Sequence, residues 1–119
     1  MSRSILLQLV RDSIQEVFQA NRTIEKAELL KEHPLLCEPI NLTIKLTIEK
    51  ELKGSFSSNN TETSLLENII IGAKKAAFED VMSSVLTTSE YLHSDIELIL
   101  HTPDGKINEI DKAIIALPI

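Results

Sequence analysis

The chain has 119 residues, of which 43% are hydrophobic and 25% are charged, a composition typical of one globular domain. A formal net charge of -6, with three Phe, one Tyr and no Trp, argues against nucleic-acid binding, because phosphates are repelled and bases find few stacking surfaces. A single cysteine excludes an internal disulfide, the apolar runs are too short to cross a bilayer, and no signal peptide opens the chain. We therefore expect a soluble, cytoplasmic protein without a membrane partner.

The first predicted element is a helix over residues 3 to 20. Its apolar residues recur at three- and four-residue steps and form one stripe, namely Ile5, Leu6, Leu9, Val10, Ile14, Val17 and Phe18. A shorter helix is predicted over residues 23 to 32. It must end near His33, because Pro34 disfavours the helical conformation in the residue before it.

The next segment predicts a β-hairpin. Polar residues separate four apolar ones, Leu42, Ile44, Leu46 and Ile48, so the strand has one buried and one wet face. A second strand follows through residues 53 to 57. The turn near residues 49 to 51 lacks the Asn-Gly or Asp-Gly pair typical of two-residue loops, so the strand is better defined than the turn.

Two capping boxes mark helix starts in the second half of the chain. Ser64 with Glu67 begins a long helix, and Thr87 with Glu90 begins a short one. The long helix presents one apolar side, formed by Leu66, Ile69, Ile70, Ala73, Ala76 and Ala77. Gly72 either weakens this helix or allows a neighbour to approach closely.

Two further strands are predicted, over residues 95 to 101 and 109 to 119. The last is apolar on both faces between Ala113 and Leu117, so it needs a cover. Together the elements predict a single α+β domain over residues 1 to 119, with an antiparallel sheet of about four strands and two long helices packed on one face. A homodimer through residues 110 to 119 is the simplest cover for the last strand.

Three blocks of the sequence are similar to the sequence pattern of a known protein family. They read SILLQLVRDSIQE from Ser4, NLTIKLTIEKELKGSFS from Asn41, and the run from Ser64 to Pro103. In this order they resemble the AMMECR domain family, also called AmmeMemoRadiSam system protein A. The resemblance implies a Memo-like or radical-SAM protein as a possible partner. It implies no reaction, because the activity of that family is itself unsettled.

The chain departs from the family pattern in three places. Where the family hairpin carries Arg, Gly, Cys, Ile and Gly, this chain reads KGSFS from Lys53, which puts any thiol chemistry in doubt at Ser55. The family's DPRF step keeps only Asp80. Family members continue into a second lobe beyond the strand that ends at Pro103, so we expect a truncated, divergent member that lacks this lobe.

The hairpin segment holds the main candidates for chemistry. Lys53 and Ser55 share a strand face by parity, which suggests a serine nucleophile activated by a lysine, with Asp80 as a third weak catalytic candidate. Lys53, Gly54 and Ser55 are also the binding candidates. No glycine-rich oxyanion loop follows and an open face keeps lysine charged, which argues against this site.

Other candidates are weaker still. His93, Asp95, Glu97 and His101 share one parity, but residues two apart on a strand lie about 7 Å apart, so no metal site and no cofactor are expected. Cys37 lies outside the family's cysteine motif and is expected to be a partly buried, inert thiol.

Two classes of function follow. The leading one is a non-enzymatic binding or scaffold module, and the alternative is a small enzyme or accessory subunit that uses residues 53 to 57 with Asp80. The enzyme requires a concave pocket where Lys53, Ser55 and Asp80 converge. The module requires an exposed apolar surface.

Overall fold

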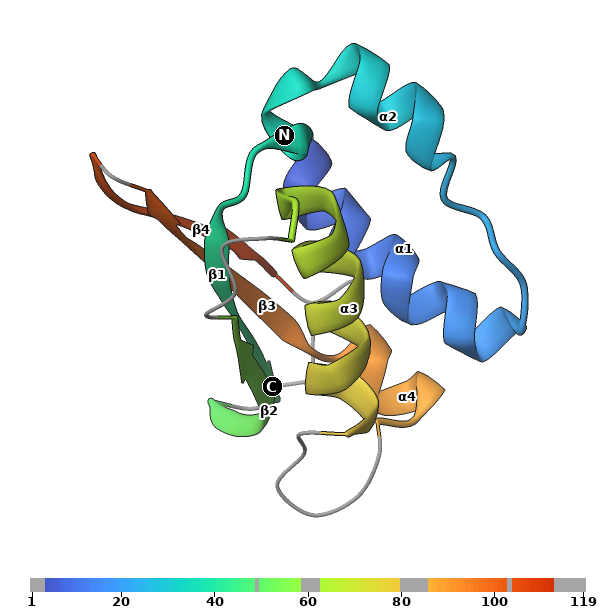
Figure 1. Ribbon diagram of the computed structural model, residues 1–119. Coiled ribbons are helices and arrows are strands. Elements are labelled where there is room, and N and C mark those ends of the chain that lie inside the picture. Colours follow the sequence, from blue (N-terminus) through green and yellow to red (C-terminus); the bar gives the residue numbers. More distant parts are fainter. Residues whose placement is uncertain (1–3, 49, 59–62, 80–85, 103, 113–119) are drawn as a thin grey trace.

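The protein folds around a four-stranded antiparallel sheet with the strand order β2-β1-β3-β4. The computed structural model describes residues 4–48, 50–58, 63–79, 86–102 and 104–112. The strands are β1 (Asn41–Ile48), β2 (Glu51–Ser57), β3 (Asp95–Thr102) and β4 (Gly105–Asp111). Two long helices, α1 (Ile5–Gln19) and α3 (Leu65–Phe78), pack against one face of this sheet (Figure 1). The predicted α+β fold is therefore confirmed.

Hydroxyl groups begin α1, α3 and the short helix α4 (Thr88–Leu92), and those of Ser64 and Thr87 are predicted by the sequence. The Ser4 hydroxyl accepts a hydrogen bond from the Leu7 N–H at the start of α1, and Ser64 does the same for Glu67 at the start of α3. Helix α4 has a complete capping box, in which Thr87 and Glu90 each bond the other's backbone N–H. Among the residues described, no helix is long and apolar enough to span a membrane.

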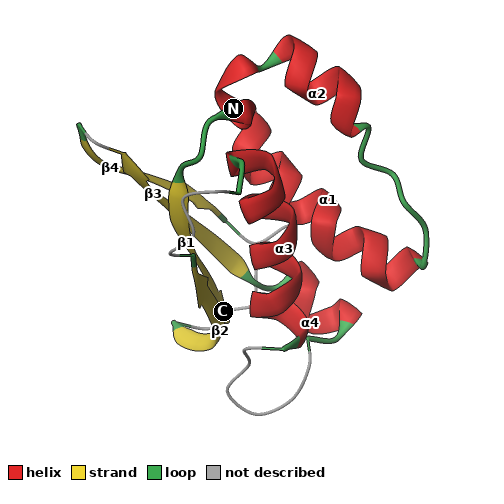
Figure 2. Cartoon of the chain, viewed as in Figure 1, coloured by secondary structure: helices red, strands yellow, loops and turns green. Residues whose placement is uncertain are grey.

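Two short elements link α1 to the sheet. Helix α2 (Lys26–Glu32) ends at His33, as the following proline predicts, and a 3-10 turn, η1 (Pro34–Cys37), comes next. Helix α2 has no buried residue, and η1 buries only Leu36. Figure 2 shows α2 away from the sheet, on the outer side of α1. Leu36 is the fully buried residue of this connection, and Ile24, Leu29 and Leu30 are partly buried against the same core.

The core lies between the helical layer and the sheet. Its fully buried members include residues from α1, α3, β1 and β3: Leu9, Val10, Ile14, Leu42, Ile44, Leu46, Leu66, Ile69, Ala73, Ala77, Ile96 and Leu98. Ile70 is 6% exposed and Ile48 is partly buried against the same cluster. The predicted pairing of the long-helix stripe with the alternating strand is thus confirmed.

Gly72 lies where α3 crosses the sheet. A Cβ atom at this position would lie 2.6 Å from Cδ2 of Phe56 and 3.2 Å from Cδ1 of Ile44. Of the two roles the sequence allowed for Gly72, close approach of a neighbour is the one observed.

The β1–β2 hairpin contains a register shift. Leu46 pairs with Gly54 and Thr47 with Leu52, so Lys53 is an extra residue opposite the Leu46/Thr47 step. Ile48 pairs with Glu51, which leaves a two-residue loop, and Lys50 in that loop has a φ of 69°. A tight turn therefore forms without the Asn-Gly or Asp-Gly signal.

The last strand differs from the prediction. Strand β4 begins at Gly105 and ends at Asp111, rather than running from residue 109 onward. The sequence Thr102-Pro-Asp-Gly105 explains the earlier start, because such a segment favours a turn, and Gly105 has a φ of 128° that suits glycine. Residues 113 to 119, with the apolar run from Ala113 to Leu117, lie outside the described residues.

Candidate functional site

Lys53 forms an ion pair with Glu90. Its Nζ atom lies 3.2 Å from Oε2 of Glu90, and its side chain is only 8% exposed. Backbone hydrogen bonding from Thr87 has the largest effect and lowers the pKa of Glu90; burial opposes it, and the Lys53 ammonium adds to the lowering. The contact joins the bulge of β2 to α4, so the lysine acts as a structural cation.

Ser55 lies elsewhere. It pairs with Lys45, whose neighbours Ile44 and Leu46 are the core-facing residues of β1, so Ser55 lies on the sheet face away from the helices. The prediction that Lys53 and Ser55 share a strand face is wrong, because the bulge breaks the alternation and lets Lys53 reach α4. Gly54 is buried opposite Leu46, and Asp80 lies outside the described residues.

The histidine and carboxylate residues around β3 do not converge. His93 caps α4 and does not belong to the strand, while Asp95 begins it. His101 Nε2 lies 3.0 Å from Oγ1 of Thr43, and Glu97 accepts a hydrogen bond from Asn108. Within the described ranges, no three His, Cys, Asp or Glu side chains are placed to hold a metal ion.

Cys37 is exposed, so the prediction of a partly buried thiol is wrong. The 3-10 turn places only one of its residues in the core, and Leu36 takes that position. The thiol that follows it faces solvent.

Glu16 is the buried carboxylate of the helical layer. It is 8% exposed, and its Oε2 accepts hydrogen bonds from the backbone N–H groups of Thr23 and Ile24, while Oε1 pairs with Lys74 at 2.9 Å. Burial raises the pKa of Glu16, but the Ile24 N–H, Lys74 and the Thr23 N–H together outweigh it and lower the pKa below its ordinary value of 4.5. These partners fix the connection between α1 and α2, which is a structural role.

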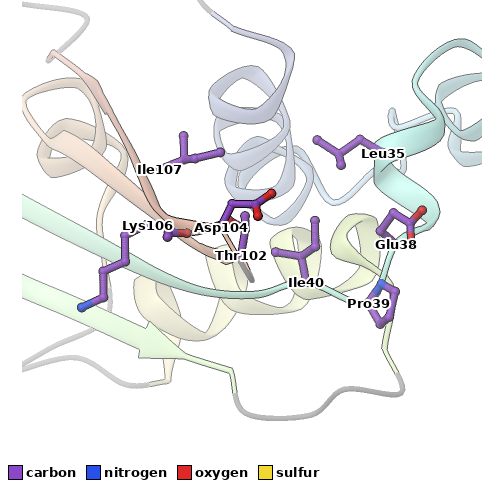
Figure 3. A pocket seen from close by; sticks show the side chains of 9 residues that line it. Leu35, Glu38, Pro39, Ile40, Thr102, Asp104, Lys106 and Ile107 are labelled. Atoms are coloured by element: carbon purple, nitrogen blue, oxygen red, sulfur yellow. Dashed lines mark hydrogen bonds between the residues drawn. The ribbon is translucent and has the colours of Figure 1, made fainter.

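A cleft of about 600 Å³ lies between the segment that enters β1 and the tip of the β3–β4 hairpin (Figure 3). We call it the hairpin cleft. Its lining residues are Leu35, Glu38, Pro39, Ile40, Thr102, Asp104, Gly105, Lys106 and Ile107. Figure 3 shows Leu35 and Ile107 on opposite sides of the hollow.

The wall that carries Leu35 is held by the core and by α3. Leu36 anchors it in the core with no exposed surface. The Glu38 carbonyl accepts a hydrogen bond of 2.7 Å from the Leu65 N–H, and the Ile40 carbonyl accepts one of 2.9 Å from Nδ2 of Asn68. Capping of α3 and positioning of this wall thus occur at the same place.

The opposite wall is the β3–β4 hairpin. Thr102 pairs with Gly105, and its hydroxyl donates a 2.6 Å hydrogen bond to the Gly105 carbonyl. Ile107 pairs with Leu100, which is buried, so Ile107 points to the helix side of the sheet. Yet Ile107 remains 49% exposed and Leu35 remains 50% exposed. Two large aliphatic side chains therefore face an open hollow.

Sequence reasoning missed this cleft. The turn signal Thr102-Pro-Asp-Gly105 was present and, if read, places Ile107 near the tip of a hairpin. The adjacent Leu35 and Leu36 after Pro34 were the other signal, because a short turn seldom buries both of two neighbouring residues. Their approach to the hairpin depends on long-range packing that no local pattern reveals.

Comparisons with known proteins support the fold. No family model and no curated protein sequence matches the chain significantly. The structure is similar to the crystal structure of an uncharacterized protein, PH0010, from Pyrococcus horikoshii, with a TM-score of 0.71 and 22% sequence identity. The alignment covers 82% of this chain and 50% of PH0010.

This likeness concerns the fold alone. The chain spans about half the length of PH0010. Neither a reaction nor a ligand follows from the similarity.

Proposed function

We propose that the protein works by binding another protein, as a non-enzymatic binding or scaffold module. The observation that carries this proposal is the hairpin cleft, in which Leu35 and Ile107 leave about half of their surface exposed on walls that are fixed in place. Exposed apolar surface of this kind is typical of interaction sites. The separation of Lys53 from Ser55 speaks against the enzyme alternative, because a lysine that serves as a base must reach the serine hydroxyl.

The module is further proposed to resemble part of the AMMECR domain, with a Memo-like or radical-SAM protein as one candidate partner. Support comes from the placement of the three sequence blocks. They fall on α1, on the β1–β2 hairpin and on the run from α3 to β3, which are the main elements of the fold. A direct binding measurement with a purified Memo-like protein tests this choice of partner.

Affinity capture from the native cytosol tests the general proposal. The bait is the whole chain, compared with Leu35→Glu, which places a charge in the hairpin cleft. The matched control is Leu52→Glu, since Leu52 is 41% exposed on β2 and does not line the cleft. We expect a partner that the wild-type chain and the control retain and that Leu35→Glu loses, and that binds again when purified. The proposal is contradicted if no captured partner binds again when purified. It is also contradicted if the partner binds Leu35→Glu as well as it binds the wild-type chain.

The enzyme alternative has its own test. A fluorophosphonate probe labels an activated serine covalently, because the serine oxygen displaces fluoride from phosphorus. We expect no labelling of Ser55 in the folded chain. The enzyme alternative would be supported if the probe labelled the wild-type chain, if Ser55→Ala abolished the labelling, and if Lys53→Met reduced it.

A further inference from the structure

We infer that the hairpin cleft takes a peptide segment of its partner in which a large apolar side chain is flanked by Lys or Arg. This inference rests on the proposed function and adds the chemistry of the occupant. Three properties of the cleft lead to it: the apolar walls, the sign of the charge at its rim and its openness to solvent.

The apolar walls call for an apolar anchor. Leu35 and Ile107 face each other across the hollow, and Ile40 lies between them in Figure 3. An anchoring side chain placed there removes apolar surface of both walls from water, which is the main favourable contribution to association. The hydrogen bonds that hold the Glu38 and Ile40 carbonyls fix one wall before binding, so little ordering is required.

The charges at the rim call for a basic flank. Glu38 and Asp104 both line the cleft, and in the described part of the chain neither carboxylate forms an ion pair. Lys106 also lines the cleft, but it lies opposite His101 in the strand register, and Figure 3 shows its ammonium directed away from Leu35. The chain as a whole carries a net charge of -6, so a basic segment is also favoured at longer range.

The openness of the cleft favours a peptide over a small ligand. Sites for small molecules bury most of the ligand surface, typically about 70 to 90%. Here Leu35 and Ile107 are each half exposed, and Asp104 lies on an exposed turn, so the hollow is open to solvent along this side. A side chain that protrudes from a partner fits such a site, while the flanking residues of that partner reach the rim.

Selection from a random-sequence peptide library on the immobilised, full chain tests the inference. We expect the enriched peptides to share a large apolar residue next to Lys or Arg. Binding of a synthetic copy is then followed through a fluorophore on Cys37, the one cysteine of the chain, which is exposed beside the cleft, and is checked by calorimetry on the unlabelled chain. Raised salt should weaken the binding.

Charge reversal gives the sharper result. Asp104→Lys should weaken binding about tenfold or more. Its matched control is Glu51→Lys, an equal change in net charge at an exposed position on the start of β2, which should leave the affinity within about twofold. Unchanged denaturant midpoints show that both variants are folded.

Three outcomes overturn the inference: no enriched peptide, enriched peptides that are acidic or uncharged, or an Asp104→Lys effect no larger than that of Glu51→Lys. The proposed function is judged separately, because a partner captured from the cytosol and lost with Leu35→Glu supports a binding module even where the basic flank is refuted.

Discussion

Arg11 and Asp111 lie 100 positions apart in the sequence and form an ion pair of 2.7 Å in which the arginine side chain has no exposed surface. The same guanidinium donates hydrogen bonds of 3.1 and 3.0 Å to the carbonyls of Ser94 and Lys112, and it lies over the Tyr91 ring. One side chain of α1 therefore holds the end of β4 and the segment between α4 and β3.

Replacement of Arg11 by Met should destabilise the fold by about 3 to 5 kcal/mol, because Asp111 and three carbonyl groups lose a shared donor. The measurement is the free energy of unfolding from urea denaturation. Arg22→Met, at an exposed position, is the control for loss of a positive charge. An Arg11→Met effect no larger than that of the control would contradict the role given to Arg11.

Replacement of Ile70 by Ala should cost about 2 to 4 kcal/mol, because it opens a cavity between α3 and the remaining core. The adjacent residue offers a matched control, since Ile71 is 42% exposed whereas Ile70 is 6% exposed. Ile71→Ala should change stability by less than about 0.5 kcal/mol. Equal denaturant midpoints for the two variants would contradict the placement of Ile70 of α3 in the core.

Replacement of Gly72 by Ala should destabilise the protein although alanine favours helices by about 1 kcal/mol. The added methyl group would lie 2.6 Å from the Phe56 ring, and overpacking of this kind costs about 1 to 3 kcal/mol. In the background of Phe56→Leu the penalty should shrink, which a double-mutant cycle measures. If Gly72→Ala stabilised the protein instead, the Phe56 ring would have to move away from α3 at little cost in free energy.

Glu16 makes stability depend on pH in the acid range. Its pKa is lowered in the folded state, so its contribution is present above the ordinary value of 4.5 and is lost as the pH falls through the lowered pKa. Glu16→Gln should lower the urea midpoint near neutral pH. It should also make the midpoint less dependent on pH below 4.5. The two curves should approach each other in acid, and parallel curves would contradict the assignment.

Self-association through residues 110 to 119 remains a prediction. In the described part of this segment, Ile110 is 55% exposed on the last strand of the sheet order. We expect light scattering at micromolar concentration to report a mass above 13.3 kDa and Ile115→Lys to reduce it. A single species of 13.3 kDa, with no change for Ile115→Lys, would rule the dimer out.

Local patterns predicted the elements of the fold well. Ser64, Thr87 and Pro34 each act within a few residues of themselves, so helix starts and the end of α2 could be read directly. The alternation from Leu42 to Ile48 likewise determined one buried face.

The candidate site could not be predicted in the same way. Parity places Lys53 beside Ser55, but the extra residue of the bulge depends on pairing with β1 and on the contact with Glu90. The hairpin cleft needs Leu35 and Ile107, which are far apart in the sequence, to lie on either side of one hollow, and neither lies in a chemical motif. Exposure of a side chain such as Cys37 follows from its neighbour Leu36 occupying the core.

The strand order has a consequence for how the chain folds. The outer pairs, β1 with β2 and β3 with β4, are each joined by a two-residue loop and can form early from nearby residues. The central pair joins Asn41 to His101 and must close a loop that contains β2, α3 and α4. We expect the meeting of the two hairpins to limit the folding rate, with α3 guiding it because this helix contacts both strands of the first hairpin. Substitutions at the β1–β3 seam should therefore slow folding.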